Sequence, residues 1–273
     1  MDNRFIVMTE YYKSYKKARY KEIYRSIAAN CKHPNIKKVI LFISKGGLPS
    51  ELGQELTHEE FGKIELYHTG SNRSSYADFF VYANDNLVGE RCILCNNDIS
   101  FDETLVLPDT FDLSGHFVCL TRWDIQKGNK LSFKKPARTR KSTQDAWMFN
   151  APLPDKMVEK GGFYMGKPGC DNMVAYLATI SGLKIMNPSG VIKARHYHMS
   201  GHRTYSRRDR LGGDAIYMHV YPHNLVEYVE DKVMYRAKPV GRATGKEAID
   251  RAVRMESANE NSWSAALKKG GKK

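Results

Sequence analysis

Cysteine is scarce in this sequence, and long hydrophobic runs are absent from it. The chain has five cysteines among 273 residues, an odd number, and Cys92 and Cys119 lie within apolar segments. This usage indicates reduced core thiols in a cytoplasmic protein and excludes a small disulfide scaffold. The longest uninterrupted apolar run, residues 39–43, is far too short to cross a bilayer, so no membrane span is expected. The opening residues 1–4 include an acid and lead directly into a strand-like segment, which is not typical of a signal peptide.

Acidic side chains are lacking from one segment and are outnumbered in another. Residues 127–141 contain seven basic side chains and no acid, and residues 236–273 contain ten basic and four acidic ones. These two segments account for the formal net charge of +13, so the rest of the chain is formally neutral. Such clusters suit a nucleic-acid-binding face, a loop that closes over a nucleoside diphosphate, or a merely solvated surface.

Apolar periodicity predicts alternating strands and helices. The β-rich runs predict strands over residues 4–9, 37–44, 63–68, 91–95 and 115–121, and helical spacing predicts helices over 13–30 and 74–84. This order favours an α/β fold with a mixed, mostly parallel sheet flanked by helices. We expect a single domain over residues 1–235, followed by a basic C-terminal helix or tail over 236–273 that is partly disordered.

Polar residues follow several of the predicted strands. In open α/β sheets ligand sites gather at the carboxyl ends of the strands, so these residues are candidates for a site. The candidates are Thr9 and Glu10, residues 71–73, residues 96–98, and residues 122–124.

The segment Asn96–Asn97–Asp98 is the sharpest local signal, because it follows a buried strand at once. Hard divalent cations take oxygen ligands and commonly bridge a carboxylate and a substrate's phosphates. Asp98 is therefore a candidate ligand of Mn²⁺ or Mg²⁺. The same segment is equally consistent with an Asn/Asp-rich turn that has no function.

Two later segments carry further candidates. Asp171 stands near the start of a predicted helix, where it could be an ordinary N-cap or a general base that deprotonates a sugar hydroxyl. His196 and His198 alternate along a strand and so lie on one side of it, where imidazoles can bind transition metals. Arg203 follows and suits a phosphate group, and Asp145 adds a carboxylate beyond the basic loop.

Taken together, these segments resemble a family of small glycosyltransferases with the GT-A fold. The family includes a rhamnosyltransferase domain of chlorella-virus multidomain enzymes and related bacterial proteins. The matching runs, spread over about residues 4–205, are FIVMTEYY, NRSSYADFFVYAN, ILCNNDISFDETL, LTRWD, STQDAWMF, GKPGCDN and NPSGVIKARHYH. The order and combination of these runs are specific, although no single run is.

The resemblance implies a Rossmann-like GT-A fold and transfer of a sugar from a nucleoside diphosphate. It implies that Thr9 and Glu10 contact the base or ribose, and that Arg73 and Asp78 help to hold the nucleotide. Residues 96–98 stand where the family has its metal-binding DxD motif, although Asn96 replaces the first acid.

The resemblance also assigns roles to the later residues. Asp171 matches the acidic residue that serves as base in inverting members, and His198 or His196 completes the metal site. Asp145, Trp123 and His196 are candidates for supporting the acceptor. The implied partners are a UDP-sugar, with UDP-L-rhamnose as the first candidate, and a glycan or glycoprotein acceptor.

Three alternatives remain open at this stage. The high net charge allows a nucleic-acid-binding protein. No recognition motif is present, however, and we do not expect nucleic acid to bind. The loss of an acid at Asn96 allows a catalytically inactive scaffold with a nucleotide-sugar fold. A nucleotidyltransferase shares the metal chemistry but usually has a glycine-rich loop after the first strand, and residues 9–12 contain no glycine.

Overall fold

The computed structural model describes residues 2–44, 46–110, 112–133, 143–201, 205–211, 217–222 and 237–239. The α-helices are α1 (Lys17–Lys32), α2 (Leu52–Glu55), α3 (His58–Gly62), α4 (Tyr76–Asn86), α6 (Asp155–Lys160) and α7 (Cys170–Ile180). The strands are β1 (Phe5–Tyr11), β2 (Ile36–Ile43), β3 (Ile64–His68), β4 (Arg91–Cys95), β5 (Ile99–Phe101), β6 (His116–Ile125), β7 (Leu131–Ser132), β8 (Gln144–Asn150), β9 (Lys184–Met186), β10 (Ala194–His196), β11 (Met218–Val220) and β12 (Ala237–Pro239). Short 3₁₀ helices lie at Glu103–Thr110, Lys127–Asn129 and Arg207–Asp209.

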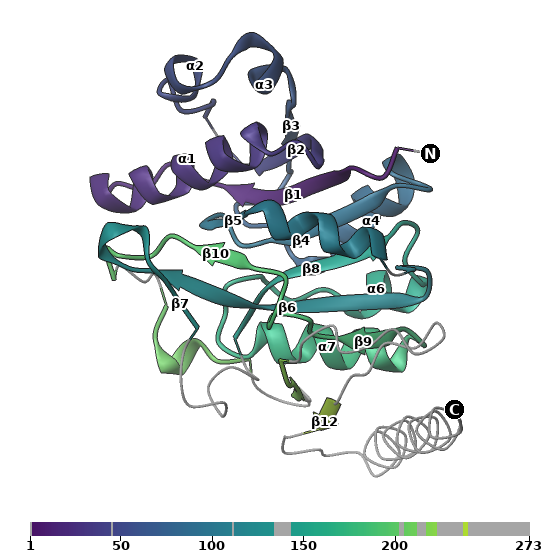
Figure 1. Cartoon of the computed structure of the whole chain (residues 1–273). Helices are drawn as coiled ribbons and strands as arrows, with labels where there is room; N and C mark the ends of the chain where they lie inside the picture. The colour runs from purple at the N-terminus through teal and green to yellow at the C-terminus, as the bar shows by residue number, and fades with distance from the viewer. Residues whose placement is uncertain are drawn as a thin grey trace, which may run out of the picture.

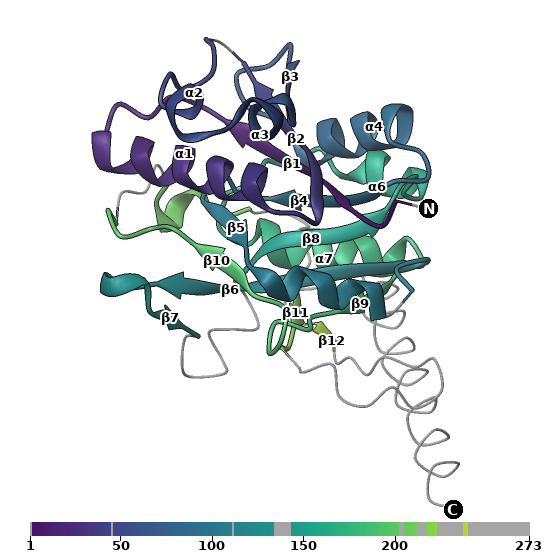
Figure 2. The same cartoon turned by 45° about the horizontal axis from the view of Figure 1, so that its top comes forward.

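A mixed sheet forms the centre of the molecule, with helices on both faces (Figures 1 and 2). Its main strand order is β3-β2-β1-β4-β8-β6-β10-β5, and β7 and β9 pair with β6 off this path. The first four strands are parallel to one another. β8 is antiparallel to both β4 and β6, and β10 is parallel to β6. The α/β class predicted from the sequence is therefore confirmed.

Alternating side chains divide the core into two layers. On β1, Phe5 and Val7 pack with the buried face of α1, while Ile6 and Met8 pack with α4, α6 and α7 on the other face. This alternation follows from the period of two along a strand. Because both faces of β1 are covered, its sequence is a continuous apolar run rather than an alternating pattern.

The strand directions explain why distant polar residues meet. β8 reverses direction between β4 and β6, so the carboxyl ends of β1, β4, β6 and β10 lie at one edge of the sheet. The amino end of β8, which begins at Gln144, lies at the same edge. Residues that leave or enter the sheet at these five points are thus brought together.

The predicted elements agree with the structure to within a few residues, with one correction. Residues 122–124 were expected to follow a strand that ends at Thr121, but β6 continues through them to Ile125. Their backbones pair with β10 and β7, and this pairing extends the strand. Among the helices of the described residues, none has the length and apolar character needed to cross a membrane. The boundary predicted at residue 235 lies outside the described residues and stays a prediction.

Candidate functional site

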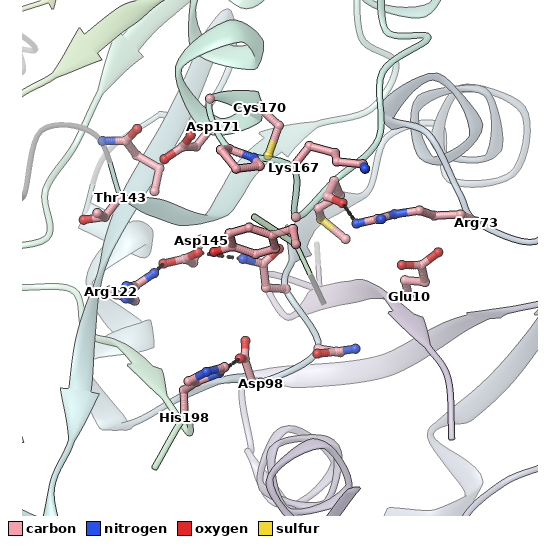
Figure 3. A pocket seen from close by; sticks show the side chains of 18 of the residues that line it. Glu10, Arg73, Asp98, Arg122, Thr143, Asp145, Lys167, Cys170, Asp171 and His198 are labelled. Atoms are coloured by element: carbon pink, nitrogen blue, oxygen red, sulfur yellow. Dashed lines mark hydrogen bonds and ion pairs between the residues drawn. The ribbon is translucent and has the colours of Figure 1, made fainter. Parts of the chain in front are cut away.

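A cavity of about 730 Å³ opens at this edge of the sheet. Its walls are mostly polar and come from the ends of β1, β4, β6, β8 and β10 and from the start of α7. In the view of Figure 3, Asp98 and His198 lie on one side and Asp171 on the opposite side, with Asp145 and Arg122 between them. Glu10 and Arg73 lie further along the cavity. A space of this volume is typical of a small-molecule site.

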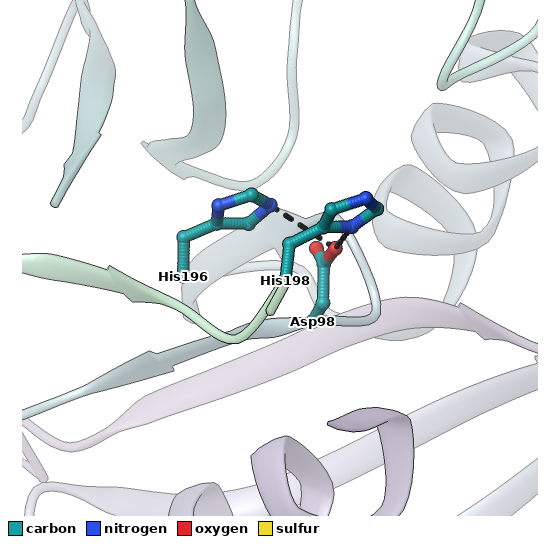
Figure 4. A group of neighbouring side chains, drawn as sticks. All are labelled: Asp98, His196 and His198. Carbon is teal, nitrogen blue, oxygen red and sulfur yellow. Dashed lines mark hydrogen bonds and ion pairs between the residues drawn. The ribbon is translucent and has the colours of Figure 1, made fainter. Parts of the chain in front are cut away.

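Asp98, His196 and His198 form a candidate metal centre, with one ligand atom from each residue within 4.8 Å of the others (Figure 4). The Oδ2 atom of Asp98 lies 3.2 Å from Nε2 of His196 and 3.4 Å from Nδ1 of His198. The two imidazole rings are stacked, with centroids 5.3 Å apart, although β10 ends at His196 and His198 lies just beyond the strand predicted to carry both. Nε2 of His198 is buried and has no hydrogen-bond partner among the described residues.

The donor set of this centre suits a transition metal. One carboxylate and two imidazoles are ligands for ions such as Mn²⁺, whereas Mg²⁺ prefers oxygen ligands alone. Asp124 lies behind the centre, with its Oδ1 atom 2.8 Å from Nδ1 of His196, and fixes the orientation of that ring. Burial opposes a charge on His196, but Asp98 and Asp124 raise the pKa of this histidine to about 9. A metal ion would therefore replace a proton on Nε2.

Arg19, which was not among the predicted site residues, reaches the centre from α1. Its Nη1 atom lies 2.7 Å from Oδ2 of Asp98 and 2.9 Å from Nδ1 of His198. Burial alone would raise the pKa of Asp98, but the charged His196 and Arg19 beside it hold this pKa well below its ordinary value. No local motif marks Arg19, because its partners lie about eighty or more residues away in the sequence.

Asp145 is held in place from two sides. Arg122 donates from Nη1 to Oδ2 of Asp145 at 2.8 Å, and Asn96 donates from Nδ2 to Oδ1 at 2.6 Å. The backbone N–H of Asn96 also donates to the carbonyl oxygen of Asp145 at 3.0 Å. This contact gives a physical reason for Asn96, because an aspartate here would place a second carboxylate against Asp145.

Asn96→Asp is therefore expected to destabilise the protein by about 1–3 kcal/mol, since a hydrogen bond becomes a like-charge contact. The affinity for Mn²⁺ should change less than about twofold, because the side chain is directed to Asp145. Urea unfolding and calorimetric Mn²⁺ titration measure the two effects, and Asn3→Asp adds the same charge at an exposed site as a control. Much tighter Mn²⁺ binding by Asn96→Asp would show that position 96 does reach the ion.

Asp171 lies in the first turn of α7 and is partly buried where it lines the cavity. The N-cap of this helix is Gly169, at φ +91°, so the alternative that Asp171 itself is the cap is wrong. A Cβ atom at Gly169 would clash with the ring of Tyr217, and the positive φ also favours glycine here. Burial, reinforced by Asp145, raises the pKa of Asp171 to about 7. This carboxyl can therefore exchange a proton near neutral pH, as a general base must.

No family model matches the chain, and no curated protein matches it. Among solved structures, it is similar to S. aureus TarS in complex with UDP-GlcNAc, at 14% identity over 74% of this chain and 62% of that chain, with a TM-score of 0.49. It is also similar to GalNAc-T7 with UDP, GalNAc and Mn²⁺, at 12% identity over 74% of this chain and 45% of that chain, with a TM-score of 0.48. For the mannosyltransferase PcManGT from Pyrobaculum calidifontis with GDP-Man and Mn²⁺, the identity is 14% over 71% of this chain and 56% of that chain, with a TM-score of 0.44.

This chain matches less than two thirds of the length of each of these three proteins. Similarity at this level identifies neither a family nor an activity, and the relation to chlorella-virus enzymes stays a prediction.

Most of the predicted site residues line the cavity, and their individual roles stay predictions. Those that line it are Glu10, Arg73, Asn96, Asn97, Asp98, Asp145, Asp171, His196 and His198. The backbone N–H of Ser74 donates to Oε1 of Glu10 at 2.9 Å, and burial raises the pKa of this carboxyl. Arg73, next to Ser74 in the chain, donates to the carbonyl oxygen of Met165. Residues 73–74 therefore connect the end of β1 to the loop before α7.

Three predicted residues do not line the cavity. Thr9 is buried within β1, and the carboxylate of Asp78 is exposed and completes the capping box of α4 with Ser75. Trp123 donates from Nε1 to the carbonyl oxygen of Ser189 at 2.8 Å and stacks on Phe133. Each side chain thus has a structural role in this state, and a contact with a ligand stays a prediction.

Two predictions fall outside the described residues. Arg203, the predicted phosphate ligand, is one of them. The other is most of the basic segment 127–141, of which residues 134–141 are not described, so its closure over a ligand stays a prediction.

Proposed function

We propose that this chain is a metal-dependent glycosyltransferase that moves a sugar from a nucleoside diphosphate to an acceptor hydroxyl. One observation carries the proposal. The Asp98–His196–His198 centre and the carboxyl of Asp171 lie on opposite sides of one polar cavity (Figure 3). A site of this design can hold a leaving diphosphate at one side and remove a proton from an attacking hydroxyl at the other.

Asp171 is the proposed base. Its raised pKa, about 7, lets it accept the proton of the acceptor hydroxyl as that oxygen attacks the sugar carbon. Attack from the side opposite to the leaving diphosphate would invert the anomeric centre. Asp145, fixed by Arg122 and Asn96, is the carboxylate placed between the two sides and is suited to hold hydroxyl groups of the sugar.

Cationic and polar side chains along the cavity would hold the donor. A Mn²⁺ ion bound by Asp98, His196 and His198 would neutralise the charge that builds on the leaving diphosphate. Arg73 and Lys167 line the cavity and can contact phosphate oxygens. Glu10, at the end of β1, is placed to accept hydrogen bonds from a ribose or base.

The finer assignments rest on the sequence resemblance. The proposed nucleotide is uridine diphosphate, the first sugar to test is L-rhamnose, and the proposed acceptor is a glycan or glycoprotein. The polar residues of the cavity are compatible with these ligands, and they suit other nucleotide sugars equally well.

Thermal stabilisation by a ligand panel tests the proposal. The panel contains nucleoside diphosphates, nucleotide sugars, nucleoside triphosphates and an oligonucleotide, each with and without Mn²⁺. A ligand that binds only the folded state raises Tm by mass action. We expect a Mn²⁺-dependent rise with one nucleotide sugar and its diphosphate, followed by sugar transfer or slow donor hydrolysis. A response to triphosphates alone would favour a nucleotidyltransferase, and a response to the oligonucleotide alone would favour a nucleic-acid-binding protein.

A further inference from the structure

The guanidinium of Arg19 lies against two of the three residues of the candidate metal centre. Its Nη1 atom donates to Oδ2 of Asp98 at 2.7 Å and approaches Nδ1 of His198 at 2.9 Å. An arginine nitrogen can only donate, so Nδ1 of His198 must be the acceptor in this contact. A lone pair on Oδ2 of Asp98 and the lone pair on Nδ1 of His198 are therefore directed at Arg19.

Helix α1 fixes the position of Arg19. Ile23 and Ile27 of this helix are buried against the sheet, and Asn30 donates from Nδ2 to the carbonyl oxygen of Ile99 at 3.0 Å. Arg19 itself is only 7% exposed. The helix thus holds a cation permanently beside the centre.

Arg19 and a metal ion cannot share these lone pairs. A metal ion of this type needs its nitrogen and oxygen ligands at about 2.0–2.2 Å. The N–H groups of Arg19 already point into that space, and two cations at such a distance repel each other in a poorly solvated site. The guanidinium must therefore withdraw before an ion can bind to Oδ2 of Asp98 and Nδ1 of His198.

Arg19 has other partners that it can keep when it withdraws. Nη2 donates to Oδ1 of Asn97 at 3.2 Å, and Nη1 lies 3.3 Å from Oε2 of Glu22. Glu22 is held in turn by Ser200, whose N–H and hydroxyl donate to it at 2.6 and 2.9 Å. Arg19 also lines the cavity, so a small movement leaves it partly compensated by Glu22.

We propose that Arg19 is a built-in competitor of the metal ion, which occupies Asp98 and His198 in the metal-free protein and sets the affinity of the centre for metal. When a metal ion binds, Arg19 moves away from Asp98 and His198 and keeps Glu22 as its counterion. The measured affinity for metal then reflects a competition between the metal ion from solution and the guanidinium that α1 supplies. Coupling of this kind typically changes an affinity by about 5- to 150-fold.

Mn²⁺ binding to the nucleotide-free protein tests the proposal, measured by the electron paramagnetic resonance signal of free Mn²⁺ and by calorimetry. Arg19→Gln should bind Mn²⁺ about tenfold more tightly than the wild type, because the competing cation is gone. Glu22→Gln should bind it several-fold more weakly, because displaced Arg19 loses its counterion. Arg25→Gln removes the same charge from an exposed position of α1 and should bind within about twofold of the wild type.

The opposite directions of the two variants make the result decisive. Unchanged or weaker Mn²⁺ binding by Arg19→Gln overturns the proposal, as does unaltered binding by Glu22→Gln if Arg19→Gln does not fold. Absence of Mn²⁺ binding in every variant overturns it as well. The measurement contains no nucleotide, so its outcome is independent of whether the wild type transfers a sugar.

Discussion

Asp171→Asn is expected to lower kcat by about 10²- to 10⁴-fold while the protein remains folded. Asparagine keeps the shape of the side chain at the start of α7 but cannot accept the proton of an attacking hydroxyl. Donor KM should change little, because Asp171 faces the metal centre from the opposite side of the cavity (Figure 3). Initial rates with the donor found in the ligand panel measure both parameters.

The same substitution should change the pH dependence in two ways. Wild-type kcat should rise as the pH passes about 7, where Asp171 loses its proton, and the variant should lack this rise. The carboxyl ionises at about 7 in the folded protein but near its ordinary value of 3.8 in the unfolded chain. Between these values ionisation favours the unfolded chain, so wild-type stability falls with rising pH. Asp171→Asn has no carboxyl to ionise at this position, so its stability does not fall in this way. Its Tm should therefore be higher than that of the wild type above about pH 7.

Asp155→Asn is the matched control, since Asp155 also lies in the first turn of a helix but is exposed. It should leave kcat, the pH profile and Tm close to those of the wild type. If Asp171→Asn retained most of the wild-type kcat, another group would have to act as the base.

Asp98→Ala is expected to abolish stabilisation by Mn²⁺ and to lower activity about 10³-fold or more, because stabilisation of the leaving group by metal is worth several kcal/mol. It should also destabilise the metal-free protein by about 3–5 kcal/mol, since Arg19 loses a buried counterion. Tm with and without Mn²⁺, urea unfolding and turnover measure these effects. Treatment of the wild type with a chelator should reproduce the loss of activity without the substitution.

Two further variants separate the metal effect from the fold. Addition of Arg19→Gln to Asp98→Ala should recover part of the stability but none of the Mn²⁺ response, because it removes the uncompensated cation and restores no ligand. Asp85→Ala, at an exposed position of α4, should match the wild type in both. A full Mn²⁺ response in Asp98→Ala would place the ion elsewhere in the chain.

The strands could be predicted because the physical signal for them is local. Residues 92–95 are apolar throughout and lie between the polar residues Arg91 and Asn96, and β4 spans Arg91–Cys95 as predicted. The gathering of Glu10 and Asp98 at one edge followed from the general property of parallel strands. The alternation of His196 and His198 likewise predicted that both rings lie on one side of the chain, and in the structure both contact Asp98.

Other parts of the site depend on tertiary pairing and could not be predicted. Arg19 belongs to an amphipathic helix and resembles any surface arginine until α1 is placed beside Asp98. Asp145 gains its role because β8 runs antiparallel and brings its first residues to the cavity. The resemblance implied that Asp78 helps to hold the nucleotide, and in the structure its carboxylate accepts a hydrogen bond from the backbone N–H of Ser75 in the capping box of α4.

The position of β10 has a consequence for the order of folding. β10 pairs with both β5 and β6, and it brings His198 to Asp98, which lies 100 residues earlier in the chain. Contacts between such distant segments form late, since much loop-closure entropy must be lost first. The centre therefore does not exist in a partly folded chain that lacks β10. Mn²⁺ should then slow unfolding and leave the folding rate nearly unchanged, because the ion stabilises the sheet only after it has formed and does not nucleate folding.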